Sequence, residues 1–181
     1  MSEIIEKHQT LDEYIDQLIE SGHEELGTGC YAEVYSIPGD DSKVIKVGQC
    51  DFSFADDPYL EYIKRIDPTN PFCPVVHSVE LVKFLDCHRY IIHLERLTEY
   101  SKVPNGPEVN QRWFKDHRVS SLDRKNVELN VADDRIVDVM DTIHAICREA
   151  LYFTCTDVGQ NNVMYRNTNQ GWIPVFTDPV C

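Results

Sequence analysis

Three polar residues near the end of the chain have types and a spacing suited to phosphoryl transfer. Asp157 and Asn162 stand five positions apart, and Asp178 follows a predicted hairpin formed by residues 163–177. In this pattern the first carboxylate accepts a hydroxyl proton, while the amide and the second carboxylate are metal ligands of the hard oxygen type that Mg²⁺ prefers. An alternative stays open, in which residues 157–159 end a helix and Asp178-Pro179 forms a simple turn.

A glycine-containing stretch lies near the start of the chain. Gly27-x-Gly29-x-x-Ala32-x-Val34 departs at one position from the G-x-G-x-x-G-x-V pattern of nucleotide-binding loops. Glycines let backbone N–H groups approach phosphate oxygens, and Val34 would cover the base. Taken alone, the stretch fits a glycine-rich hairpin without a ligand better than a nucleotide-binding loop.

The next predicted strand carries a lysine. Val44 and Lys46 are two positions apart, so they share one face of a strand. The Lys46 ammonium would reach the phosphates while Val44 lines the adenine, and Glu61, on the following helix, would pair with Lys46. The alternative for Lys46 is an ordinary surface charge.

Periodicity and capping residues predict the elements around these side chains. Thr10 and Glu13 form a capping box at the start of a short amphipathic helix, whose outer face is acidic. Asp57-Pro58 begins a second helix, and a long helix with a regular apolar stripe follows Asn130. Strands are predicted at residues 25–36, 43–47, 75–85 and 89–97, and a hairpin with strands at 163–165 and 173–177 follows.

This order of elements predicts an α+β fold in two lobes, with an antiparallel sheet in the first. We expect an N-terminal helix in residues 1–24, a first lobe at 25–98, a linker or insertion at 99–130 and a small second lobe at 131–181. The insertion should contain one short helix near Trp113. Ser120 and Ser121 within it, beside arginines, are either autophosphorylation sites or ordinary loop residues.

Composition narrows the classes of partner. The 181 residues include 42% hydrophobic and 27% charged residues, which are globular values. A formal charge of −14 argues against binding to nucleic acid and favours a basic partner, although acidity also serves solubility. Seven scattered cysteines, no basic leader and no long apolar run predict a reduced, cytoplasmic protein that neither enters nor crosses a membrane.

The motifs together resemble the early serine/threonine protein kinases of T7-like bacteriophages. The resemblance covers roughly residues 26–181, discontinuously, through LGTGCYAEVYS, KVIKVG, D-x-x-x-x-N-x-V-M and TDPV in place of DFG. It implies an ATP- and Mg²⁺-dependent kinase, with Mn²⁺ as an alternative ion. Such a kinase phosphorylates host proteins, and in some cases itself, in the bacterial cytoplasm early in infection.

Residue roles carry over by position. The resemblance implies that Lys46 contacts the α- and β-phosphates, that Asp157 is the catalytic carboxylate, and that Asn162 and Asp178 hold Mg²⁺. The residues that it places around the nucleotide are Gly27, Gly29, Val34, Val44, Lys46, Glu61, Leu94 as gatekeeper, Glu95 and Leu97 in the hinge, and Met164 beneath the base.

The chain also departs from cellular kinases. Cys155-Thr156-Asp157 replaces H-R-D, and only three residues follow Asp178, so activation-loop switching is not expected. A peptide substrate would then be held by residues 101–130, by the acidic helix or by a second copy of the chain in a homodimer.

Two further hypotheses accompany the kinase. One is a catalytically weak, kinase-like binding protein or inhibitor that sequesters a host factor through its acidic surface. The other is a phosphotransferase for small molecules such as aminoglycosides or choline.

Overall fold

The computed structural model describes residues 4–50, 54, 57–104, 134–150, 156–158, 162–169 and 171–180. These residues form an α+β structure with a six-stranded mixed sheet and a separate two-stranded hairpin, which confirms the predicted class. Two compact units divide the chain: Met1–Asp57 with Val75–Arg96, and Pro58–Pro74 with Leu97–Cys181. Residues 105–133, which include Trp113, Ser120 and Ser121, lie outside the described part.

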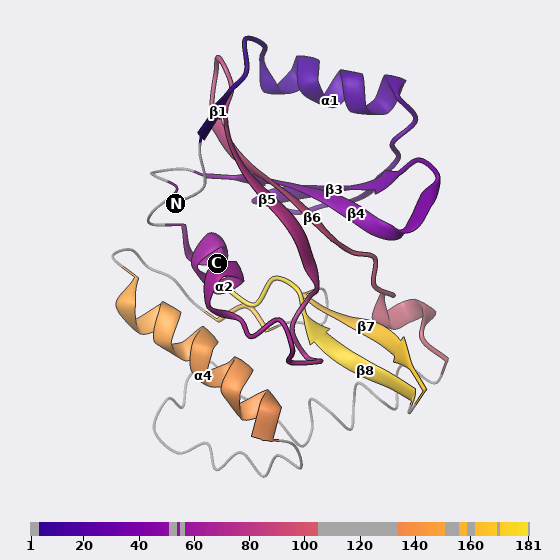
Figure 1. Cartoon of the computed structure of the whole chain (residues 1–181), viewed down its shortest axis with the longest axis vertical. Coiled ribbons are helices and arrows are strands. Elements are labelled where there is room, and N and C mark those ends of the chain that lie inside the picture. Colours follow the sequence, from indigo (N-terminus) through magenta and orange to yellow (C-terminus); the bar gives the residue numbers. More distant parts are fainter. Residues whose placement is uncertain are drawn as a thin grey trace. The chain divides into compact units, whose positions relative to one another are not determined.

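The six-stranded sheet makes up most of the first unit, and its strands run in the order β1-β5-β6-β4-β3-β2 (Figure 1). The strands are β1 (Ile4–Glu6), β2 (Glu25–Thr28), β3 (Ala32–Ile37), β4 (Asp40–Gln49), β5 (Val76–Lys83) and β6 (His88–Glu95). Residues 25–36, predicted as one strand, therefore form two antiparallel strands that turn around residues 29–31.

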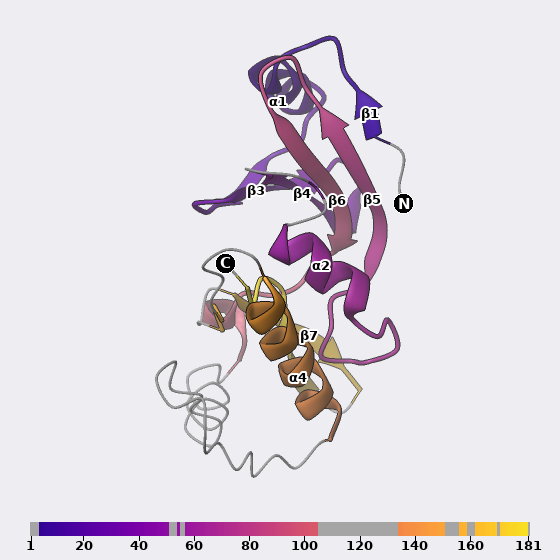
Figure 2. The ribbon, with the colours of Figure 1, turned by 90° about the vertical axis from the view of Figure 1, so that its left-hand side faces the viewer.

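The prediction of a fully antiparallel sheet is wrong at one edge, where two strands pair in parallel. Strand β1 pairs in parallel with β5, from Ile4 opposite Leu81 to Glu6 opposite Lys83 (Figure 2). A three-residue strand is too short to show a period of two, so periodicity could not reveal it. Because β1 and β5 are far apart in sequence, no tight hairpin forces them to be antiparallel.

Helix α1 (Leu11–Glu20) covers one face of this sheet. The predicted capping box is present, because Thr10 Oγ1 accepts from the Glu13 N–H and the Glu13 carboxylate accepts from the Thr10 N–H. Asp86, in the turn between β5 and β6, also accepts a hydrogen bond from the Leu11 N–H at 3.1 Å. The Asp86 carboxylate satisfies the Leu11 N–H, which has no partner within the helix, and ties α1 to the sheet.

The core beneath α1 is apolar and comes from alternate positions of the strands. Leu18 of the helix packs on Tyr35 of β3, on Ile45 and Val47 of β4, and on the facing residues of β5 and β6. The Tyr14 ring packs against the Phe84 ring at a tilt of 46°, with 5.3 Å between the ring centroids. Since Ile45 and Val47 face α1, the intervening Lys46 must face the other side of the sheet.

The second unit contains α2 (Pro58–Arg65), a short 3₁₀ turn at Tyr100–Lys102, α4 (Asp134–Glu149) and the hairpin of β7 (Val163–Thr168) and β8 (Gly171–Phe176). Helix α2 lies alongside α4 in both views (Figures 1 and 2). Its contacts group it with this unit, whereas the sequence assigned it to residues 25–98. The apolar stripe of α4 is buried as predicted at Ile136, Val139, Met140 and Ile143, together with Ile146.

Hydrogen bonds to backbone carbonyls connect the parts of the second unit. The buried Tyr62 hydroxyl donates to the Phe176 carbonyl at 2.9 Å, joining α2 to the end of β8. The Arg166 guanidinium of β7 donates to the carbonyls of Pro71 at 2.6 Å and Cys73 at 3.0 Å. The segment that follows α2 is thereby held against the hairpin.

Two properties of the described residues bear on the predicted environment. No helix among them is both long and apolar enough to span a membrane. None of the five described cysteines is in a disulfide.

Candidate functional site

Val34, Val44, Lys46 and Leu94, which are predicted to line a nucleotide, lie on the sheet face opposite α1. Lys46 is directly opposite Val34 on β3 and Ile92 on β6, and Val34 is opposite Gly27 on β2. Val44 is likewise opposite Leu94. Directly opposed residues of antiparallel strands share a face, so these residues lie in two adjacent rows. The prediction that Val44 and Lys46 share a face is confirmed.

Lys46 is only 5% exposed, which is unusual for a lysine. A buried ammonium must be compensated by oxygen acceptors, since its desolvation is otherwise costly. The alternative of an ordinary surface charge does not describe this side chain.

The two glycines of the predicted phosphate loop are not required by the packing of the fold. A Cβ at Gly27 would meet nothing within 4 Å, and a Cβ at Gly29 would lie 3.6 Å from the Ala32 carbonyl, an ordinary contact. Neither residue has a positive φ. The absence of a Cβ leaves space beside the exposed backbone of Gly27 and Gly29, although the Gly29 N–H already donates to the Ala32 carbonyl at 2.8 Å.

Gly48 has the opposite character, and the sequence did not reveal it. A Cβ at this position would lie 1.8 Å from Cζ of Tyr90, the residue directly opposite on β6. The tyrosine ring occupies the volume that any side chain at position 48 would need. Gly48 therefore lets Tyr90 pack flat across β4, two positions from Lys46 on the same face.

The predicted hinge begins at the end of β6. Leu94 is buried on the same face as Val44, while the Glu95 carboxylate accepts a hydrogen bond from the Val75 N–H at 2.8 Å. The Glu95 N–H donates in turn to the Val75 carbonyl at 3.0 Å. The Glu95 side chain thus holds the start of β5. Leu97 and Met164 belong to the second unit, where both are half-buried.

In the second unit, the three residues of the predicted catalytic and metal-binding set come together. The Asn162 side-chain amide donates to the Asp157 carbonyl at 3.0 Å, and the Asp157 N–H donates to the Pro179 carbonyl at 2.8 Å. The Asp178 N–H lies 3.4 Å from the Asn162 carbonyl. Asp157, Asn162 and Asp178, which we call the acid–amide cluster, are therefore linked through the backbone on either side of the hairpin.

This arrangement differs from the two simple turns considered as an alternative. Thr156 forms an antiparallel bridge with Val180, which brings the segment at Asp157 next to the segment that contains Asp178, where the backbone bends. The end of α4 at Glu149 is separate from Asp157 in the chain. The two aspartates are held next to each other by pairing of distant segments, which local turns would not produce.

The donor set of the acid–amide cluster fits a hard divalent cation. Because the Asn162 NH₂ group donates to the Asp157 carbonyl, Oδ1 is the amide atom that could serve as a ligand for a cation. No group of three or more His, Cys, Asp and Glu side chains suited to a metal exists among the described residues. A cation here would accordingly depend on two carboxylates and one amide, with water or phosphate oxygens completing its shell.

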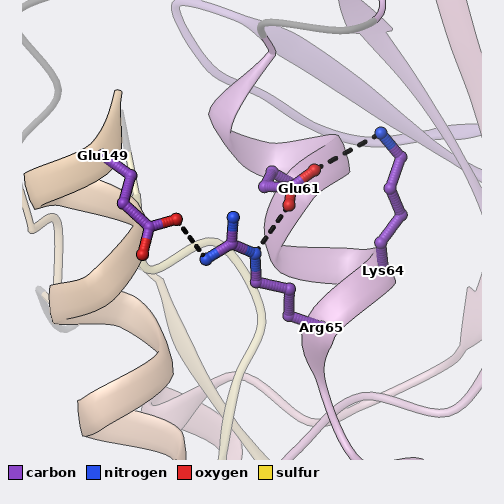
Figure 3. Close-up of polar contacts among 4 residues, drawn as sticks. All are labelled: Glu61, Lys64, Arg65 and Glu149. Carbon is purple, nitrogen blue, oxygen red and sulfur yellow. Dashed lines mark hydrogen bonds and ion pairs between the residues drawn. The ribbon is translucent and has the colours of Figure 1, made fainter. Parts of the chain in front are cut away.

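Glu61 takes part in an ion-pair network that the sequence did not predict (Figure 3). Its carboxylate binds Arg65 Nε at 2.6 Å and lies 3.5 Å from Lys64 Nζ, while Arg65 also binds Glu149 of α4 at 2.7 Å. The hydrogen bond from Arg65 lowers the pKa of Glu61 below its usual value. The pairing of Glu61 with Lys46 stays a prediction, in which Lys46 would compete with Arg65 for the carboxylate.

No protein-family model matches the sequence, and no curated protein matches it.

Proposed function

We propose that this protein is an ATP- and Mg²⁺-dependent serine/threonine protein kinase of the phage type, with a protein-kinase-like fold. Its substrates are host proteins phosphorylated early in infection in the bacterial cytoplasm, and the chain itself is a second substrate. The observation that carries the proposal is the acid–amide cluster. Asp157 and Asn162 stand in D-x-x-x-x-N order and Asp178 follows the hairpin, and hydrogen bonds of 3.0 Å and 3.4 Å link Asn162 to the two aspartates. The first unit supports it through the buried Lys46 beside Val34 and Val44.

Each residue has a specific role in this proposal. Asp157 accepts the proton of the substrate hydroxyl and orients its oxygen for attack on the γ-phosphorus. Asn162 and Asp178 offer oxygens to Mg²⁺, which when bound neutralises charge on the phosphate oxygens. Lys46 contacts the α- and β-phosphates, and the open backbone at Gly27 and Gly29 lies along them.

The burial of Lys46 leads to a binding experiment that needs no turnover. Lys46→Met keeps the aliphatic stem and removes the charge. The control is Lys43→Met, which makes the same change on the other face of β4, at a lysine that forms an ion pair with Asp40. Losing a charged hydrogen bond costs about 1.5–3 kcal/mol, so Lys46→Met should weaken ATP binding by about 10- to 100-fold. Equal affinity of both variants in a titration calorimeter would contradict the assignment.

Phosphoryl transfer itself is best tested with isosteric variants. Asp157→Asn should reduce transfer from ATP to lysate proteins by about 10²- to 10⁴-fold if the carboxylate acts as a positioned base. Asp141→Asn, at an exposed position on α4, is the matched control and should retain activity. Intact-mass spectrometry of the expressed protein should show increments of about 80 Da in the wild type and in Asp141→Asn only. Wild-type protein that transfers no phosphate with Mg²⁺ or Mn²⁺ would reject the kinase proposal.

A specific observation favours one other function, a binding protein that sequesters a basic host factor. Helix α1 presents Asp12, Asp16 and Glu20 on its exposed side, opposite the buried Leu18. Such a row of carboxylates steers cationic partners without any catalysis. This function is selected if Asp157→Asn keeps the full biological effect while Asp12→Asn/Asp16→Asn abolishes it.

A further inference from the structure

Thr177 makes contacts with the acid–amide cluster that the sequence did not predict. Its hydroxyl donates to the Asn162 carbonyl at 3.0 Å, and its own backbone N–H donates to the same oxygen at 3.0 Å. The Asp178 N–H approaches this oxygen at 3.4 Å. Three donors from two consecutive residues therefore converge on one carbonyl oxygen of Asn162.

The three hydrogen bonds to the Asn162 carbonyl respond differently to a substitution at position 177. The two N–H donors belong to the backbone and remain after any substitution at position 177, as does the β7–β8 ladder that places Val163 opposite Phe176. The hydroxyl bond is the one side-chain contact of the three, and it fixes the χ1 angle of Thr177 while drawing the exit of β8 toward Asn162. Asp178 is the next residue along the chain, so its Cα follows.

Building on the proposed function, we infer that Thr177 is a positioning residue, whose hydroxyl sets the spacing between the Asn162 amide and the Asp178 carboxylate and thereby tunes the affinity for the divalent cation. Thr177 does not touch the cation. It acts as groups behind metal ligands generally do, by orienting the ligands, and loss of such a contact typically weakens metal binding by about 10- to 100-fold.

The chain offers a matched control for this inference. Thr142 in α4 donates its hydroxyl to the Asp138 carbonyl at 2.9 Å, a bond of the same kind remote in the chain from the cluster. Thr177→Val and Thr142→Val each replace a hydroxyl by a methyl group without changing the shape of the side chain. Thr177→Ser restores the donor, and Thr177→Ala removes it with a smaller side chain.

The test measures Mn²⁺ binding by electron paramagnetic resonance in the presence of a non-hydrolysable ATP analogue, with thermal unfolding followed for each variant. We expect Thr177→Val and Thr177→Ala to weaken Mn²⁺ binding by about 10- to 100-fold, with Thr177→Ser and Thr142→Val within about threefold of wild type. Metal-free binding of the analogue should be unchanged in all of them.

The outcomes separate this inference from the proposed function. Wild-type protein that binds neither the analogue nor Mn²⁺ would overturn both. If the wild type binds both but Thr177→Val binds Mn²⁺ equally well, the role of Thr177 is wrong while the kinase proposal stands. If Thr177→Ser is as weak as Thr177→Val, the methyl group and not the hydroxyl matters, and the inference is likewise overturned.

Discussion

Gly48→Ala should destabilise the protein far more than an ordinary glycine-to-alanine change in a strand. The added Cβ would lie 1.8 Å from Cζ, 1.9 Å from Cε2 and 2.2 Å from Oη of Tyr90. Ordinary contact begins at 3.4 Å, so the ring would have to retreat by about 1.6 Å. Tyr90 is only 3% exposed, which leaves little room for that movement.

Two limits bound the cost of this clash. Overpacking that neighbours can relieve in place costs about 1–3 kcal/mol, whereas expelling an aromatic ring from a core costs about 3–5 kcal/mol. Because Tyr90 is pressed directly against β4, we expect about 3 kcal/mol. For a chain of this size that corresponds to a Tm lower by about 6–12 °C.

The measurement is a double-mutant cycle followed by circular dichroism in urea. Tyr90→Leu removes the three clashing atoms, so Gly48→Ala should cost less than about 0.5 kcal/mol in that background. Gly27→Ala, where nothing lies within 4 Å of the new Cβ, should change stability by less than about 0.5 kcal/mol. The packing argument would be refuted if Gly48→Ala cost the same with and without the tyrosine ring.

Three smaller predictions concern the described ionisable and polar groups. Burial raises the pKa of the Cys73 thiol to about 11, whereas Cys30 is exposed. Iodoacetamide at pH 8 should therefore label Cys30 in the native protein and Cys73 only on unfolding. Equal labelling rates of the two cysteines in the native protein, measured by mass spectrometry, would contradict this. The pKa of Glu61 is lowered by Arg65, so its contribution to stability is present above the pKa of an unfolded glutamate, about 4.3, and is lost as the pH falls through the lower folded value. Glu61→Gln should therefore flatten the loss of stability in urea titrations below about pH 4.5, and an unchanged acid limb would show that the ion pair is inconsequential. Tyr62→Phe removes a buried hydrogen bond and should lower the free energy of unfolding by about 1 kcal/mol, whereas no change in the urea midpoint would mean that this bond does not link α2 to β8.

Much of the fold follows from local patterns that the sequence alone displays. The capping box at Thr10, the Asp57-Pro58 helix start and the apolar stripe of α4 each depend on residues within a few positions of one another. The shared face of Val44 and Lys46 follows in the same way from strand geometry. Such signals survive without knowledge of the fold because their physical basis is backbone conformation and the burial of one side of an element.

Other features came only from the tertiary structure. The parallel pairing of β1, the Asp86 carboxylate at the start of α1 and the requirement for glycine at position 48 each join segments at least 40 residues apart. Pairing and packing of distant segments leave no periodic trace in either segment. The ion pair between Arg65 and Glu149 of α4 could not be predicted for the same reason, because the sequence shows Arg65 only as a cation at the end of a helix.

The acid–amide cluster shows most clearly which features come from the sequence and which come from the tertiary structure. The sequence by itself determined which side chains stand there, because the D-x-x-x-x-N spacing and the hairpin before Asp178 are local properties. Only the tertiary structure decided that the Asn162 amide donates to the Asp157 carbonyl and that the Thr177 hydroxyl reaches Asn162. Hydrogen bonds of this kind depend on distances between backbone segments, and those distances are set when Thr156 and Val180, far apart in the chain, pair.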